Sequence, residues 1–237
     1  MEISYNHPFY QNATLKLLEG LWFNQGKISK RRYQDMCMSA MLLSIVSYGK
    51  IISSKTTEIV DYILNHQMSD GGWNCAWDST SNKSSKSSFH TTISVLEAFL
   101  DFSKYDNDYR HNDIMSAAKR AEEYLLDRKL MFSLSKEKIV DDKFLEFHYP
   151  VRYKYDCFRA LEYFVDKDYK YDSRMNSALQ ILKDKLDNGP ILVGNQYSGK
   201  RHFRLETTLY GRFNTFRALK IIKKYAPDLF SEYIMES

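Results

Sequence analysis

The side chains of this chain that could carry out chemistry include a small number of widely spaced thiols. The three cysteines, Cys37, Cys75 and Cys157, are odd in number and far apart in the sequence. Such a set is typical of free thiols or metal ligands in a reducing compartment. For Cys37 the alternative is a small buried hydrophobic residue with no chemistry of its own.

Two short sequence patterns indicate how the elements around these thiols are arranged. Asp70-Gly-Gly-Trp-Asn-Cys75 predicts a turn that ends one helix, and Ser88-Phe-His-Thr-Thr92 predicts the start of the next. This phrasing resembles the repeat of the α/α toroids, the family of squalene cyclases and protein prenyltransferase β subunits. The resemblance covers most of the chain from about Tyr33 onward. It implies an enzyme that acts on an apolar, isoprenoid-like substrate in an aromatic cavity.

The same resemblance implies a zinc site. In prenyltransferases an Asp-x-Cys pair and a later Tyr-His-Thr bind zinc, and this chain has Asp35-x-Cys37 and Phe89-His90-Thr91 at comparable places. Residues i and i+2 of a regular helix point in nearly opposite directions, so Asp35 and Cys37 can share an ion only if Asp35 lies at the N-cap. Asp35, Cys37 and His90 would leave one tetrahedral position open, as in catalytic sites. Cys75 as a fourth ligand would close the site and make it structural.

Ordinary packing is the alternative for the same residues. Asp35 is also a favoured N-cap residue, and His90 would then be a hydrogen-bonded core histidine. Isolated cysteine and histidine residues more often pack in the core than bind a metal.

Candidate substrate-binding residues lie near the predicted metal site. Arg32 precedes Asp35 by three residues, where prenyltransferases place a lysine that holds the isoprenoid diphosphate. Met38 replaces the tyrosine that those enzymes carry after the cysteine, which weakens this role for Arg32. Trp73 and Trp77 are candidates for the wall of an apolar cavity.

Further candidates open the later repeats. Arg152, Tyr155 and Asp156 precede the third repeated helix, and Arg212 and Asn214 open the fourth. We expect these side chains to face the same rim as the predicted metal. The alternative is an Arg–Asp ion pair and aromatic packing.

Four segments of similar pattern predict a repeat of inner helices that begin at Asp35, His90, Tyr155 and Phe213. Amphipathic segments between them predict outer helices over residues 56–68, 115–130 and 175–186, and a further helix is expected over residues 14–23, before the first repeat. We therefore predict an all-α single domain over residues 1–237, an open or partial α/α toroid of about four helical hairpins. Six hairpins close the ring in the family, so we expect a dimer or a partner subunit to complete it.

The composition bounds the function classes. Apolar residues make up 43% of the chain and charged residues 27%, which indicates a globular protein, and 18 Tyr, 14 Phe and 3 Trp supply aromatic side chains for a core or a cavity wall. The net charge of +4 is spread among residues of both signs, so no nucleic-acid partner is expected. No apolar run reaches about 18 residues, so we expect no membrane span and a cytoplasmic location.

Two reaction types of related toroids are disfavoured. The chain lacks the Asp-x-Asp-Asp acid with which squalene cyclases protonate an alkene. It also lacks an Asp-Asp-x-x-Asp on an apolar helix for magnesium-dependent ionisation, because the pair Asp141-Asp142 lies in a polar stretch. The competing function class is a non-catalytic toroid that binds a protein or a lipid.

Overall fold

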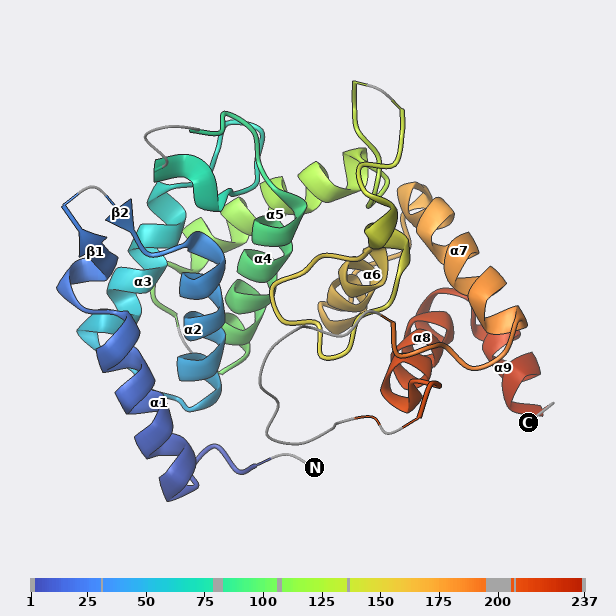
Figure 1. Cartoon of the computed structure of the whole chain (residues 1–237), viewed down its shortest axis with the longest axis horizontal. Coiled ribbons are helices and arrows are strands. Elements are labelled where there is room, and N and C mark those ends of the chain that lie inside the picture. Colours follow the sequence, from blue (N-terminus) through green and yellow to red (C-terminus); the bar gives the residue numbers. More distant parts are fainter. Residues whose placement is uncertain are drawn as a thin grey trace. The chain divides into compact units, whose positions relative to one another are not determined.

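The computed structural model describes residues 3–30, 32–78, 83–105, 108–135, 137–194, 206 and 208–235. This part of the chain is mostly helical (Figure 1), and its one sheet is an antiparallel pair of short strands, β1 (Lys27–Ser29) and β2 (Arg32–Tyr33). The prediction of an all-α fold is confirmed, whereas the toroid arrangement stays a prediction. No helix in the described ranges is long and apolar enough to cross a membrane.

The chain divides into two compact units, unit 1 (Met1–Tyr124) and unit 2 (Leu125–Ser237). The prediction of one domain over residues 1–237 stays a prediction.

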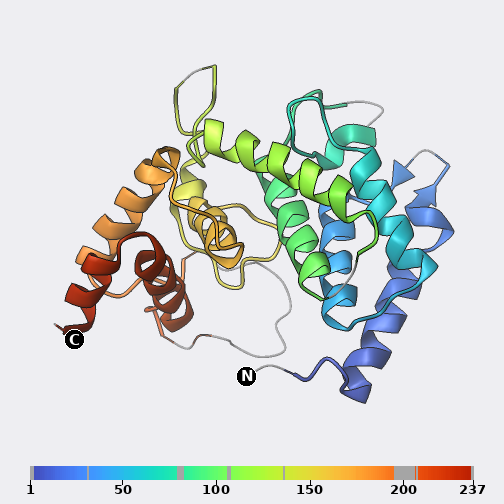
Figure 2. The ribbon, with the colours of Figure 1, turned by 180° about the vertical axis from the view of Figure 1, so that it is seen from behind.

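Unit 1 is built around a pair of packed helices, α2 (Met36–Tyr48) and α4 (Phe89–Lys104), whose mutual contact is the most extensive in the unit. Two further helices, α1 (Pro8–Leu21) and α3 (Ser54–Asn65), pack against α2. The helix α5 (His111–Asp127) follows α4 in the chain and is seen in full in Figure 2. Apolar and small residues run almost all round α2, which explains its burial. Its fully buried side chains include Met36, Ala40, Leu42, Leu43 and Val46.

Unit 2 contains α6 (Cys157–Asp166), α7 (Asn176–Asp187), α8 (Arg212–Tyr225) and α9 (Pro227–Met235), with the short 3-10 helices η3 (Asp142–Leu145) and η4 (Ser173–Met175). The helix α6 packs against α7 and α8, and α8 packs against α9.

A shared tetrapeptide, Phe-Arg-Ala-Leu, lies in both α6 and α8 of this unit. Its arginines, Arg159 and Arg217, are both buried, but Phe158 is buried while Phe216 is 68% exposed. The two copies of the tetrapeptide therefore share a buried arginine but differ in the burial of the phenylalanine before it.

The predicted starts of the inner helices are confirmed to within two residues. Asp35 is the N-cap of α2, His90 is the second residue of α4, and Phe213 is the second residue of α8. Tyr155 lies just before the N-cap of α6, Asp156. The other predicted helices correspond to α1, α3, α5 and α7, and the first of these begins earlier than expected because Pro8 opens it behind the His7 cap.

The two glycines of the Asp70-Gly-Gly-Trp turn allow a close approach of backbone segments. Gly71 has a φ of +96°, and a Cβ on it would lie 2.7 Å from the carbonyl oxygen of Arg120 in α5. A Cβ on Gly72 would lie 2.4 Å from Oγ1 of Thr92 in α4. The same hydroxyl accepts the backbone N–H of Trp73 at 3.1 Å, so the missing side chains let the turn reach both neighbouring helices.

Residues on each side of the glycines fasten the turn. Trp73 is fully buried, and its indole N–H donates to the carbonyl of Ile63 in α3 at 2.8 Å. The carboxylate of Asp70 accepts the backbone N–H of Ser87 at 2.9 Å, just before α4. The turn therefore ties the end of α3 to the start of α4.

We predict that Gly71→Ala lowers the free energy of unfolding by about 2 kcal/mol or more, because a left-handed φ in a non-glycine residue alone costs about 1–3 kcal/mol. The urea midpoint of the full chain, followed by circular dichroism, measures this loss. The matched control is Gly20→Ala in α1, where an added Cβ has nothing within 4 Å and should stabilise the helix by about 0.5–1 kcal/mol. Equal midpoints for the two variants would contradict the role given to Gly71.

Candidate functional site: a thiol pair at the start of a buried helix

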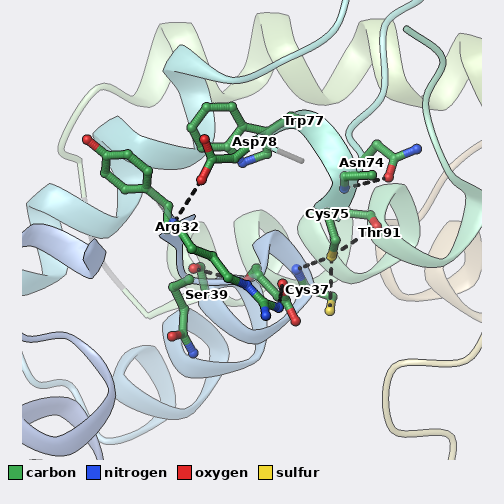
Figure 3. Close-up of polar contacts among 12 residues, drawn as sticks. Arg32, Cys37, Ser39, Asn74, Cys75, Trp77, Asp78 and Thr91 are labelled. Carbon is green, nitrogen blue, oxygen red and sulfur yellow. Dashed lines mark hydrogen bonds and ion pairs between the residues drawn. The ribbon is translucent and has the colours of Figure 1, made fainter. Parts of the chain in front are cut away.

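The structure brings two of the three cysteines together in unit 1. The Sγ atoms of Cys37 and Cys75 are 3.2 Å apart, and both thiols are free. Cys37 lies in the first turn of α2, and Cys75 opens the 3-10 helix η2 (Cys75–Asp78). The backbone N–H of Cys37 donates to Sγ of Cys75 at 3.3 Å (Figure 3). Both side chains are half-buried, so reagents in solution can reach the pair.

The position of Cys75 follows from the residues on either side of it. Trp73 is held in the core, and the side chain of Asn74 bridges the turn. Its Oδ1 accepts the N–H of Ala76 at 2.9 Å, and its Nδ2 donates to the carbonyl of Lys86 at 2.8 Å. These bonds hold Cys75 opposite the N-terminus of α2.

The hydrogen bonds around the two sulfurs favour a thiolate at Cys75. Its Sγ already receives the Cys37 N–H, and the hydroxyl of Thr91 lies 3.5 Å away. The sulfur–sulfur contact, with Cys37 keeping the proton, is the chief cause that lowers the pKa of Cys75 from 9.0 to about 6, and burial opposes the shift. The same contact and burial raise the pKa of Cys37. The first proton of the pair is therefore lost more readily from Cys75 than from Cys37.

Asp35 lies where the sequence predicted, at the N-cap position of α2, but its side chain makes no capping hydrogen bond. Its Oδ1 instead pairs with Nη2 of Arg32 at 3.0 Å, with 65% of the arginine side chain and 42% of the aspartate side chain exposed. Exposed ion pairs of this kind contribute only about 0–1 kcal/mol, so the carboxylate can exchange partners at little cost. The diphosphate-binding role of Arg32 stays a prediction.

The predicted ligand set is only partly assembled. His90 lies in the first turn of α4, half-buried, one residue before the Thr91 that neighbours Cys75. In the parts of the chain that the structure describes, no group of three or more His, Cys, Asp or Glu side chains is arranged to hold a metal ion. The structure therefore brings Cys37 and Cys75 together but does not complete a site with Asp35 and His90, and zinc binding stays a prediction.

An aromatic cluster surrounds Trp77, which lies in η2 two residues after Cys75. Its other members are Tyr33, Tyr62 and His66. The ring of Trp77 lies 3.8 Å from that of His66, 5.6 Å from Tyr33 and 5.9 Å from Tyr62, measured between centroids. The Trp77 indole N–H also donates to the Tyr62 hydroxyl at 3.1 Å. Trp77 thus lies in an aromatic environment two residues from Cys75, whereas fully buried Trp73 anchors the fold. Substrate binding by either residue stays a prediction.

Sequence reasoning missed three of these neighbours. Tyr62 and His66 are four residues apart at the end of the amphipathic segment 56–68, and that spacing was the available signal. Thr91 was part of the Phe-His-Thr pattern but was not given a role.

The candidates Tyr155 and Asp156 have packing partners in unit 2. Tyr155 is buried, and its hydroxyl donates to the carbonyl of Leu130 at 2.6 Å. Asp156 caps α6 by accepting the backbone N–H of Arg159 at 2.7 Å, and its other oxygen lies 3.3 Å from Nδ1 of buried His148. These contacts give both residues a structural role in unit 2, and the Arg–Asp ion pair of the alternative stays a prediction.

The remaining candidates also lie in unit 2. Asn214 is buried and donates to the carbonyl of Leu192 at 3.0 Å, so it ties α8 to the preceding loop. Arg212 opens α8, is 75% exposed in its side chain, and lies 3.5 Å from the carboxylate of Glu206. Arg152 is exposed and adopts a left-handed backbone conformation before α6. Substrate binding by these residues stays a prediction.

The comparisons with known proteins add no identification. No protein-family profile matches the chain, and no curated protein and no solved structure shows significant similarity to it. The resemblance to the α/α toroids therefore stays a prediction that rests on the sequence patterns.

We predict that alkylation of Cys75 by iodoacetamide follows a titration centred near pH 6, because the thiolate is the nucleophile. At pH 7 about 90% of such a thiol is ionised, against about 1% for a pKa of 9. Nucleophilicity falls with pKa, so the net gain in rate is only about fourfold and the pH profile is the sharper measurement.

Peptide mapping after short exposures at pH 5 to 9 gives this profile. Buried Cys157 should stay unmodified in the folded protein and serves as the internal control. Cys37→Ala removes the main cause of the lowered pKa, so it should move the midpoint for Cys75 upward. A wild-type midpoint near 9 would contradict the arrangement of charge described above.

Proposed function

We propose that Cys37 and Cys75 are the anchoring ligands of a zinc ion in a helical enzyme of the prenyltransferase and squalene cyclase type. The observation that carries this proposal is the 3.2 Å contact between the two sulfurs. Thiolates are preferred zinc ligands, and zinc binding requires their deprotonation. The lowered pKa of Cys75 makes this thiol easier to deprotonate for metal binding.

Asp35 and His90 are the residues that would complete the coordination. The Asp35 carboxylate is held only by an exposed pair with Arg32, and His90 lies in the first turn of the helix that brings Thr91 to Cys75. Binding by one of them gives three protein ligands and an open position, as in catalytic sites, whereas binding by both gives a closed, structural site. When bound, zinc would lower the pKa of a substrate thiol or of water and so supply a nucleophile.

The substrate class that we propose is an apolar, isoprenoid-like molecule. Aromatic side chains near the thiols, with Trp77 in the same short helix as Cys75, support it because such rings form the walls of apolar ligand sites. Arg32 would attract an anionic group of the substrate to the start of α2. The reaction proposed is a transfer to a thiol, and the location proposed is the cytoplasm, where thiols stay reduced.

The non-catalytic alternative, a toroid that binds a protein or a lipid, needs no metal. Metal binding therefore separates the two functions.

We predict that the full chain, reconstituted without an affinity-tag metal, binds about one zinc per molecule. Cys37→Ala and Cys75→Ala should each weaken binding at least about 100-fold, since even substitutions outside the ligand shell cost roughly 10–100-fold. Cys157→Ala should leave affinity unchanged because that thiol is buried in unit 2. Competition with a chromophoric chelator measures the affinities.

The variants Asp35→Asn and His90→Ala then assign the class of the site. Loss of affinity in only one of them supports the open, catalytic arrangement, and loss in both supports a closed, structural one. A wild-type chain that takes up no zinc, with no thiolate–metal absorption after cobalt is added, would replace the enzyme proposal by the binding-module alternative.

We also propose that a second copy of the chain completes the ring of helices. Large apolar side chains are exposed at the start of α8, where Leu209 is 72%, Tyr210 56% and Phe216 68% accessible. Exposed apolar groups of this kind often mark interfaces.

We predict that Phe216→Glu weakens self-association at least about tenfold, because a charge would be buried in an apolar contact. Light scattering over a concentration series measures the dissociation constant. Tyr171→Glu changes an exposed aromatic residue elsewhere in unit 2 and is the matched control. Wild-type protein that stays monomeric at high concentration would refute the proposed dimer.

A further inference from the structure

The thiol pair has a second chemistry that needs no metal. Cys37 and Cys75 come from segments 38 residues apart, yet their sulfurs are in contact and free. A disulfide would require the sulfurs to close from 3.2 Å to about 2.05 Å. The half-buried position of both side chains leaves the pair open to a small reagent, whereas Cys157 is fully buried.

We propose that Cys37 and Cys75 form a thiol–disulfide exchange site, in which a low-molecular-weight disulfide oxidises them to an intramolecular disulfide. This inference goes beyond the proposed zinc site and does not depend on it. The reagent class is set by the chemistry of the pair, because one thiol attacks the reagent and the neighbouring thiol completes the exchange.

The surroundings of the two sulfurs assign their roles. Sγ of Cys75 accepts the backbone N–H of Cys37 at the N-terminus of α2, and the hydroxyl of Thr91 lies beside it. A helix N-terminus and hydrogen-bond donors stabilise negative charge on sulfur, so Cys75 is the attacking thiolate. Cys37, in contact with it, is the resolving thiol.

The exchange balances in two steps. The Cys75 thiolate attacks one sulfur of the reagent disulfide, forms a mixed disulfide and releases one reagent thiolate. Cys37 then gives up its proton and attacks Sγ of Cys75, which forms the Cys37–Cys75 bond and releases the second reagent thiolate. The protein loses two electrons and two protons, and the reagent disulfide is reduced to two thiols.

The surrounding structure favours closure over a lasting mixed disulfide. The hydrogen bonds of Trp73 and Asn74 fix the backbone next to Cys75. Cys37 is held in place because it belongs to the buried helix α2. The resolving thiol is therefore held beside the mixed disulfide at a high effective concentration.

The test uses the full chain, free of metal and with a chelator present, equilibrated with mixtures of oxidised and reduced glutathione. After acid quenching and alkylation, the wild-type protein should lose two alkylation sites and two hydrogen atoms of mass. Peptide mapping should show the bond between Cys37 and Cys75. Absence of that linked peptide at every glutathione ratio, or a link to Cys157, would overturn the proposal.

Two variants test the roles of the thiols. Cys37→Ala should accumulate a mixed disulfide with glutathione at Cys75, because the resolving thiol is gone. In Cys75→Ala, the mixed disulfide at Cys37 should form at about one tenth of that rate or more slowly still. Equal rates would overturn the assignment of Cys75 as the attacking thiol. The Cys157→Ala variant should form the internal disulfide as the wild type does, and failure to do so would count against the pair acting alone.

A parallel zinc titration of the reduced protein separates this proposal from the proposed function. Disulfide formation without zinc binding supports the exchange site and removes the zinc enzyme. Zinc binding without disulfide formation supports the zinc enzyme and removes the exchange site.

Discussion

The close approach of the backbone at Gly71 and Gly72 to α5 and α4 is the constraint on which unit 1 depends. Because neither residue has a side chain, the Trp73 N–H reaches Thr92 and the Trp73 indole reaches the Ile63 carbonyl. Cys75 follows only two residues later, so its place opposite α2 is set by the same turn. The patterns that suggested a family resemblance thus have a direct structural reason in this chain.

Local signals were enough to predict most of the helices. The inner helix at Asp35 was predicted from the repeated segments, and the structure places Asp35 at the N-cap position of α2. Long-range packing was less accessible. The tetrapeptide Phe-Arg-Ala-Leu occurs in both α6 and α8, yet Phe158 is buried and Phe216 is exposed because the two helices have different neighbours.

The sequence identified Cys37 and Cys75 as candidates for one site, but not the direct contact between their sulfurs. Cys37 and Cys75 are 38 residues apart, and only the turn after Trp73 shows that their sulfurs meet. The helical phase at the start of α4 was also out of reach of the sequence alone. Consecutive residues of a helix point roughly 100° apart, and it is the Thr91 hydroxyl that neighbours Cys75 in the structure.

The bond from the Cys37 N–H to the Cys75 sulfur has a consequence for the dynamics of α2. Asp35 does not cap this helix with its side chain, so the sulfur of a distant residue satisfies one of its unpaired amides. Anything that changes the electron density on that sulfur changes how readily the first turn frays. Amide hydrogen exchange at the start of α2 would then report on the state of the thiol, and a ligand that orders this turn would in return alter the reactivity of Cys75.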